Sequence, residues 1–229
     1  MTFANVDVLL GDHPGVSPET VQAQLIDRGR GGYCFEHGQI FAAALEYLGF
    51  SVRRHLGRVR GLSSARTHTT VHVDLDGRRY MCDPGFGFSV TGPIPLEDGA
   101  VRSEGDRHFK IEKRQDSGAP IWALTRQGNA EHFTDELPVH PIDVYTGHLI
   151  TSTSPQSVFT QHLMVMRHTD EGHVTVTEGG VTTRVPGRET EHREITAAEA
   201  VRLARDLGVR LTEHEGRRLQ RVLDDLQAK

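Results

Sequence analysis

The first fifty residues repeat apolar side chains at helical spacing. After Gln39 the apolar positions are Ile40, Phe41, Ala44, Leu45 and Leu48, and Gly49 ends the run. An earlier helix has Ser17 as its cap and Pro18 at its first position, and Gly29 stops it. Its apolar stripe consists of Val21, Leu25 and Ile26. The pattern predicts a mainly helical N-terminal part.

From Phe50 the periodicity changes to two. Residues 52–59 and 67–75 alternate as strands do, and Asp76-Gly77 then gives a strong hairpin signal before the chain returns over 78–83. Further strand-like pieces occupy 108–113, 121–125 and 132–133. Up to about residue 150, the pattern predicts an antiparallel sheet or barrel.

From residue 151 onward, the sequence combines strand-like and helical spacing of apolar residues. Residues 151–157 form a polar connector, and weaker strands follow at 174–177 and 181–185. Thr196 and Glu199 have the spacing of a capping box, which opens a helix to about Leu207, and a last charged helix covers 212–227. The fold class predicted from these elements is α+β.

Composition narrows the function classes. The chain has 229 residues and a formal net charge of -5, which gives no support for a nucleic-acid partner. No window reaches the roughly 18 apolar residues of a membrane span, and the start has no secretory signal. The two cysteines form no metal-type cluster. We therefore expect free thiols in a cytoplasmic protein, and most of the 14 histidines at its surface.

One cysteine has the surroundings of a nucleophile. Cys34 follows Gly31 and Gly32 and stands at the mouth of the second predicted helix. The positive end of a helix dipole and its unpaired N–H groups favour the thiolate, which is the reactive form. The same position also suits a buried structural cysteine, since free cysteine is often buried.

The hairpin supplies a partner for this thiol. If Asp76-Gly77 is a two-residue turn, Asp74 faces Arg79 as a favourable charge pair, His72 faces Met81 and Thr70 faces Asp83. His68 and Asp83 then become diagonal neighbours on one face, about 7–8 Å apart. A carboxylate there orients an imidazole, and with Cys34 the parts of a Cys–His–Asp site are present.

Other arrangements compete with this one. His68 and His72 lie about 13 Å apart on a strand, too far to share one ion, so we expect no metal site. His72 is expected at a strand face or the surface, and Cys82 alternates away from Asp83 and is expected to pack. His37 stays an alternative base. The loop around Phe86 and Gly87 suits a close backbone approach to an acyl or phosphate group, or merely a turn.

Taken together, the segments RGGYCFEHG, RTHTTVHV, YMCDPGFG and STSPQSVF resemble the arylamine N-acetyltransferase family, in order and in separation. That family carries an RGG-x-C-x-E-x-N segment, an R-T-H strand and an Asp-Val-Gly-Phe-Gly segment. The opening residues 3–11 also resemble the family's Phe-Glu-Asn-Leu-Asp-Val-Leu-Leu-Gly segment. The resemblance covers essentially the whole chain.

The resemblance implies a shortened helical domain over 1–50 that carries the nucleophile, a β-barrel domain over 51–153 with the His and Asp, and an α/β lid over 154–229. It implies a cysteine-protease-like Cys–His–Asp core formed by Cys34, His68 and Asp83. The family's CoA and acceptor cleft maps onto Thr67, Phe86 and Gly87. The implied reaction is ping-pong transfer from acetyl-CoA, as co-substrate and with no bound cofactor, to an arylamine or arylhydrazine.

The sequence departs from the family at several points. Gly38, Pro84 and Ala4 replace the family's Asn, Val and Glu, and family members usually carry further residues before Phe3. Two explanations are open: the start of the sequence is annotated late, or the helical domain is naturally shortened. A shortened domain would expose a core face, which bears on stability or on dimerisation through that face. Three rival functions remain: an amide synthase that takes an acyl chain from a carrier protein, a cysteine hydrolase or transglutaminase-like enzyme, and a non-catalytic homologue that binds only.

Overall fold

The hairpin predicted at Asp76-Gly77 organises the larger of the chain's two sheets. In a computed structural model that describes residues 1–228, strand β3 (Arg66–Leu75) pairs with β4 (Arg78–Cys82) in the predicted register, Asp74 opposite Arg79 and His72 opposite Met81. Both turn residues have positive φ, 51° at Asp76 and 75° at Gly77, the backbone that a two-residue hairpin requires. The Asp74–Arg79 ion pair forms at 2.9 Å.

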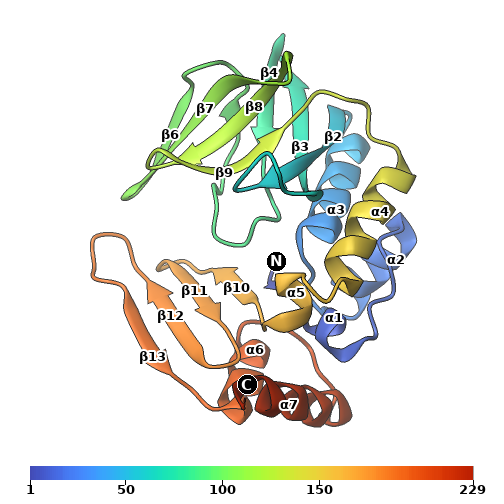
Figure 1. Ribbon diagram of the computed structural model, residues 1–229, viewed down its shortest axis with the longest axis vertical. Helices are drawn as coiled ribbons and strands as arrows, with labels where there is room; N and C mark the ends of the chain where they lie inside the picture. The colour runs from blue at the N-terminus through green and yellow to red at the C-terminus, as the bar shows by residue number, and fades with distance from the viewer. Residues whose placement is uncertain (229) are drawn as a thin grey trace. The chain divides into compact units, whose positions relative to one another are not determined.

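This sheet has eight antiparallel strands in the order β5-β4-β3-β2-β9-β8-β7-β6, and its two edge strands approach each other to give a nearly closed barrel (Figure 1). The other strands are β2 (Ser51–Val59), β5 (Ile94–Pro95), β6 (Val101–Glu104), β7 (Arg107–Asp116), β8 (Ala119–Arg126) and β9 (Asn129–Thr134). The barrel predicted from the alternating pattern is confirmed.

Helix α3 (Cys34–Tyr47) packs on the outside of β2 and β3. Ala42 of the helix lies in one apolar cluster with Val71 and Val73 of β3, and Cys82 packs against that cluster. The opposite face of β3 carries His68, Thr70 and His72, and all three are buried as well. The strand alternates as predicted, but both of its faces are covered.

Residues 34–148 form one compact unit, and residues 1–33 form a second with the described residues from 149 onward. In the second unit a five-stranded antiparallel sheet has the order β1-β10-β11-β12-β13. Its strands are β1 (Phe3–Ala4), β10 (Val165–His168), β11 (His173–Val176), β12 (Gly180–Arg184) and β13 (Glu191–Glu194). The division into three domains at residues 50 and 153 stays a prediction.

Helices α6 (Ala197–Asp206) and α7 (Glu213–Gln227) cover this sheet, with a core that includes Val165, Val176, Leu219 and Leu223 (Figure 1). The Thr196 side chain caps α6, and Thr212 forms a complete capping box with Glu215 at α7. The shorter helices of this unit are α1 (Val6–Leu10), α2 (Pro18–Gln22), which continues as a π-helical turn over Ala23–Asp27, and α5 (Val158–Gln161).

Three expectations differ from the structure. Helix α4 (Pro141–Thr153) occupies residues that the pattern assigned to the sheet region and to the polar connector. Ile26, expected in an apolar stripe, is 55% exposed, whereas Val21 and Leu25 are buried as predicted. Half of the histidines are buried, among them His72, because the barrel interior holds several imidazoles.

Among the described residues, no helix is both long enough and apolar enough to cross a bilayer.

Candidate active site

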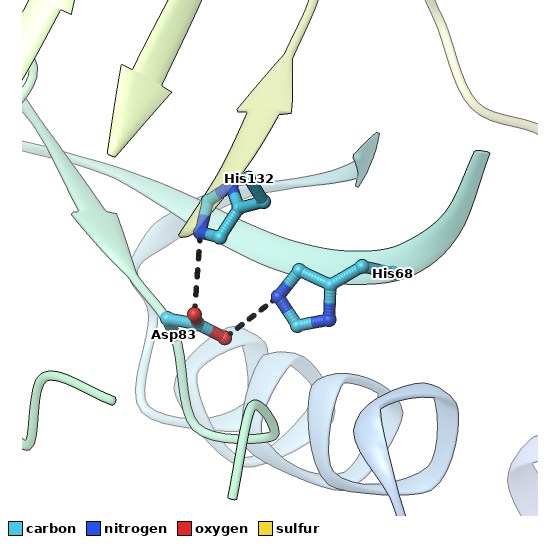
Figure 2. A group of neighbouring side chains, drawn as sticks. All are labelled: His68, Asp83 and His132. Atoms are coloured by element: carbon cyan, nitrogen blue, oxygen red, sulfur yellow. Dashed lines mark hydrogen bonds and ion pairs between the residues drawn. The ribbon is translucent and has the colours of Figure 1, made fainter. Parts of the chain in front are cut away.

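The site is built at the end of the barrel where β3 begins and β4 ends. His68 is the third residue of β3, and Asp83 follows the last residue of β4. His68 Nε2 lies 2.9 Å from Asp83 Oδ1, a hydrogen bond between side chains that are 2% and 0% exposed (Figure 2). The diagonal neighbours predicted from the hairpin register are therefore joined directly.

Charge dominates the ionisation of this pair. Burial lowers the pKa of His68, but the Asp83 carboxylate, assisted by the neighbouring Cys34, outweighs burial and raises that pKa to about 10. Burial alone would raise the pKa of Asp83, and the charge of His68 holds it well below its usual range instead. The pair is therefore an imidazolium and a carboxylate at neutral pH.

Cys34 is the first residue of α3 and is buried. Its Sγ contacts the Thr67 carbonyl oxygen at 3.6 Å, so the thiol lies beside the strand residue that precedes His68. Gly85 of the loop after β4 also lies against Cys34, since a Cβ on Gly85 would stand 2.6 Å from the Cys34 Cα. The loop after β4 thus packs directly onto the backbone of the cysteine.

The other predicted residues surround the same point. The Phe86 ring meets the His68 ring edge to face, with centroids 5.0 Å apart, and Gly87 turns the loop with a φ of 87°. Thr67 is half-buried at the start of β3. All six residues singled out from the sequence therefore belong to one compact unit.

Two further residues named in the sequence lie nearby. His37 is buried in α3, and a Cβ on Gly85 would stand 3.1 Å from its Cβ. The thiol of Cys82 has its pKa raised to about 11, by burial and then by the charge of Asp83, so it stays protonated. Asp83 contacts two imidazoles, that of His68 and that of a second histidine for which the sequence pattern predicts no role.

That residue is His132 of β9, whose Nε2 lies 3.3 Å from Asp83 Oδ2 (Figure 2). Strand β2 brings it there, because Gly57 pairs with His68 on one side and with Thr134 on the other. The sequence pattern predicts a short strand at residues 132–133. No local signal in the sequence shows which strand pairs with the end of β2. The contact is non-local, so sequence spacing could not have found it.

His68, Asp83 and His132 also form the chain's one group of potential metal ligands within residues 1–228, with ligand atoms all within 4.8 Å of one another. Two imidazoles and a carboxylate are a donor set that zinc accepts. The 2.9 Å hydrogen bond accounts for the arrangement without an ion, because it already satisfies His68 Nε2 and Asp83 Oδ1.

The chain is similar to known proteins over nearly its whole length. A family model described as N-acetyltransferase matches residues 1–215. The arylamine N-acetyltransferase of Mycolicibacterium smegmatis is 33% identical over 95% of this chain and 83% of that protein.

Two solved structures are also similar. The arylamine N-acetyltransferase of Mycobacterium abscessus has a TM-score of 0.90 at 28% identity, over 98% of this chain and 84% of that one. The Mycobacterium marinum enzyme in complex with CoA has a TM-score of 0.88 at 28% identity, over 99% of this chain and 88% of that one. With the sequence match over nearly all its length, the chain belongs to the arylamine N-acetyltransferase family.

Proposed function

We propose that the protein is an acetyl-CoA-dependent arylamine N-acetyltransferase that carries the acetyl group on Cys34. The observation that carries this proposal is the buried His68–Asp83 pair beside a thiol at a helix start, in a chain of this family. Related enzymes are named for this activity, and one of them is described in complex with CoA.

The first half-reaction uses the charge state of the pair. An imidazolium next to a thiol stabilises the thiolate, and His68 is held in that form by Asp83. The Cys34 thiolate attacks the carbonyl carbon of acetyl-CoA, and the bond from that carbon to the CoA sulfur breaks. The departing CoA thiolate takes the proton from His68. The products are CoA and a thioester on Cys34.

The second half-reaction reverses these roles. The amine nitrogen attacks the thioester carbonyl, and His68, now neutral, takes the proton that the nitrogen loses. The bond to Cys34 Sγ breaks, which returns the thiolate and the imidazolium and releases the amide. We assign the binding of CoA and the acceptor to Thr67, Phe86 and Gly87. Thr67 contacts Cys34 through its carbonyl oxygen, the Phe86 ring contacts the His68 ring, and Gly87 follows Phe86 in the loop.

The acyl donor separates this proposal from its nearest rival. The test is to incubate the protein with acetyl-CoA or with an acetyl thioester of an acyl-carrier protein, and to measure the intact mass over time. The proposal predicts one added acetyl group from acetyl-CoA, absent in Cys34→Ala. Labelling by the carrier thioester alone would support an amide synthase, and labelling by neither would support a non-catalytic homologue.

A homodimer and a cytoplasmic location stay proposals. Large apolar side chains are exposed on the unit that contains the site, including Tyr47, Leu48 and Ile142, and a second copy of the chain would cover such residues. Light scattering across a concentration series tests this directly: a single mass of one chain at all concentrations would contradict the dimer.

A further inference from the structure

Asp83 has two oxygen atoms to satisfy, and only one of them is bound by His68. The carboxylate side chain is fully buried, so solvent cannot supply a donor to the second oxygen. The group that faces Oδ2 is the His132 ring, which is itself 0% exposed (Figure 2). A buried carboxylate with one unpaired oxygen is destabilised in its ionised form.

Each nitrogen of the His132 ring has a polar neighbour, and together these neighbours are compatible with only one tautomer. His132 Nδ1 lies 3.2 Å from the Thr134 hydroxyl oxygen. If the hydroxyl donates to Nδ1, the ring proton sits on Nε2 and points at Asp83. The opposite tautomer would turn a nitrogen lone pair toward a carboxylate oxygen, which is repulsive. The pairing with Asp83 therefore selects the form in which Nε2 carries the proton.

His132 meets this need as a neutral group. Burial lowers its pKa, although the carboxylate opposes that effect. A second imidazolium here would also stand close to that of His68, since the two ring centroids are 4.9 Å apart. The ring therefore holds one proton, on the Nε2 that lies 3.3 Å from Asp83 Oδ2, while His68 keeps the positive charge of the site.

We infer that His132 is a positioning residue for the acetyl transfer, which acts through Asp83 by holding the carboxylate ionised and oriented toward His68. This inference rests on the proposed function for its effect on rate. The relay is Thr134 hydroxyl to His132, His132 to Asp83, and Asp83 to His68, and it runs entirely within the barrel.

The direct test compares His132→Phe, which removes the donor, with His132→Gln, which keeps an N–H donor. We expect His132→Phe to slow the acetylation of Cys34 by acetyl-CoA on the order of 10- to 100-fold, the loss of one hydrogen bond to a buried charge. His132→Gln is expected to recover most of that loss. In NMR titrations, His68 should lose its proton at lower pH in His132→Phe than in the wild type, and His132→Gln should reverse this.

The matched control is His72→Phe, which replaces another buried imidazole of the same barrel. No contact between His72 and Asp83 is found in the described part of the chain. This variant should leave the His68 titration where it is. If His132→Phe does not fold, Thr134→Val removes only the hydroxyl beside His132 Nδ1. Thr70→Val is its control, because the Thr70 hydroxyl is buried and makes no hydrogen bond with the described residues. Thr134→Val is expected to slow acetylation, and Thr70→Val is not.

Unchanged acetylation and an unchanged His68 titration in His132→Phe would overturn the inference. So would a stoichiometric zinc ion in the wild-type protein that His132→Phe loses, because the three side chains would then be metal ligands. The titration needs no acetyl donor. A wild type that acetyl-CoA never labels, with a His68 titration that still shifts, would therefore refute the proposed function and leave the role of His132 standing.

Discussion

Replacing Gly85 with alanine adds one methyl group at the point where the loop after β4 touches the cysteine. An ideal Cβ on Gly85 would lie 2.6 Å from the Cys34 Cα, 3.1 Å from its carbonyl oxygen and 3.1 Å from the Cβ of His37. Two of these three atoms belong to the backbone of Cys34, at the start of α3, so they cannot rotate away as the end of a flexible side chain would.

The size of the effect follows from these distances. Carbon atoms in contact are normally about 3.5–4.0 Å apart, so the loop or Cys34 must move by about 1 Å. Overpacking of this kind typically costs about 1–3 kcal/mol of unfolding free energy. A displacement of about 1 Å between reacting groups can also slow a reaction about 100-fold. We expect a moderate loss of stability and a much larger loss of acetylation rate.

The assay measures both quantities on the same sample, by urea unfolding and by the rate at which acetyl-CoA labels Cys34. Gly61→Ala is the control in the same compact unit, because its Cβ would meet nothing closer than the Ser63 hydroxyl at 3.9 Å. It should change neither quantity much. Wild-type labelling in Gly85→Ala would refute the reasoning that the close approach of this loop sets the position of the thiol.

Three other variants test separate parts of the structure. A Cβ on Gly38 would lie 2.7 Å from the Thr69 Cγ2, so Gly38→Ala should lower the unfolding free energy by about 1–3 kcal/mol. Thr69→Ser should recover part of this in the double variant, and strict additivity would contradict the clash. Burial, followed by the charge of the stacked His55, holds the pKa of His72 well below 6.5. As the pH falls through 6.5, His72 is therefore protonated in the unfolded chain but not in the folded protein. The unfolding free energy should fall over this range by up to about 1.4 kcal/mol per pH unit. His72→Phe should flatten that slope in urea unfolding at pH 5 to 8, and equal slopes would contradict the assignment. Arg30 and Asp7 form a buried ion pair at 2.7 Å, so Arg30→Met should lower the unfolding free energy by about 3–5 kcal/mol, and a loss under about 1 kcal/mol would show that the pair is not buried in solution.

The positions of His68, Asp83 and Cys34 could be predicted because they depend on local features of the sequence. The Asp76-Gly77 turn sets the register of β3 and β4, and alternation then decides which side chains share a face. These two facts place His68 beside Asp83 from sequence alone. Cys34 could be placed at a helix start for the same reason, since the apolar spacing of α3 is a local property.

Features that depend on distant strand pairing could not be predicted in this way. His132 reaches Asp83 because β9 pairs with the end of β2 at Gly57, and no turn signal links those strands. The departure at Gly38 also has a non-local explanation: the Thr69 methyl group of β3 occupies the space that a side chain there would need. The residues of α4 follow the predicted strands without a break that the pattern marks, so the pattern extends the sheet region into this helix.

The central claim is that the acetyl group passes through Cys34. The most direct measurement is to isolate the protein after reaction with acetyl-CoA, locate the acetyl group by peptide mass spectrometry, and then add an aromatic amine. We predict a single acetyl group on Cys34 that leaves upon amine addition, with one N-acetyl product formed for each group lost. An acetyl group on another residue, or its loss to water with no acetylated amine, would contradict the account.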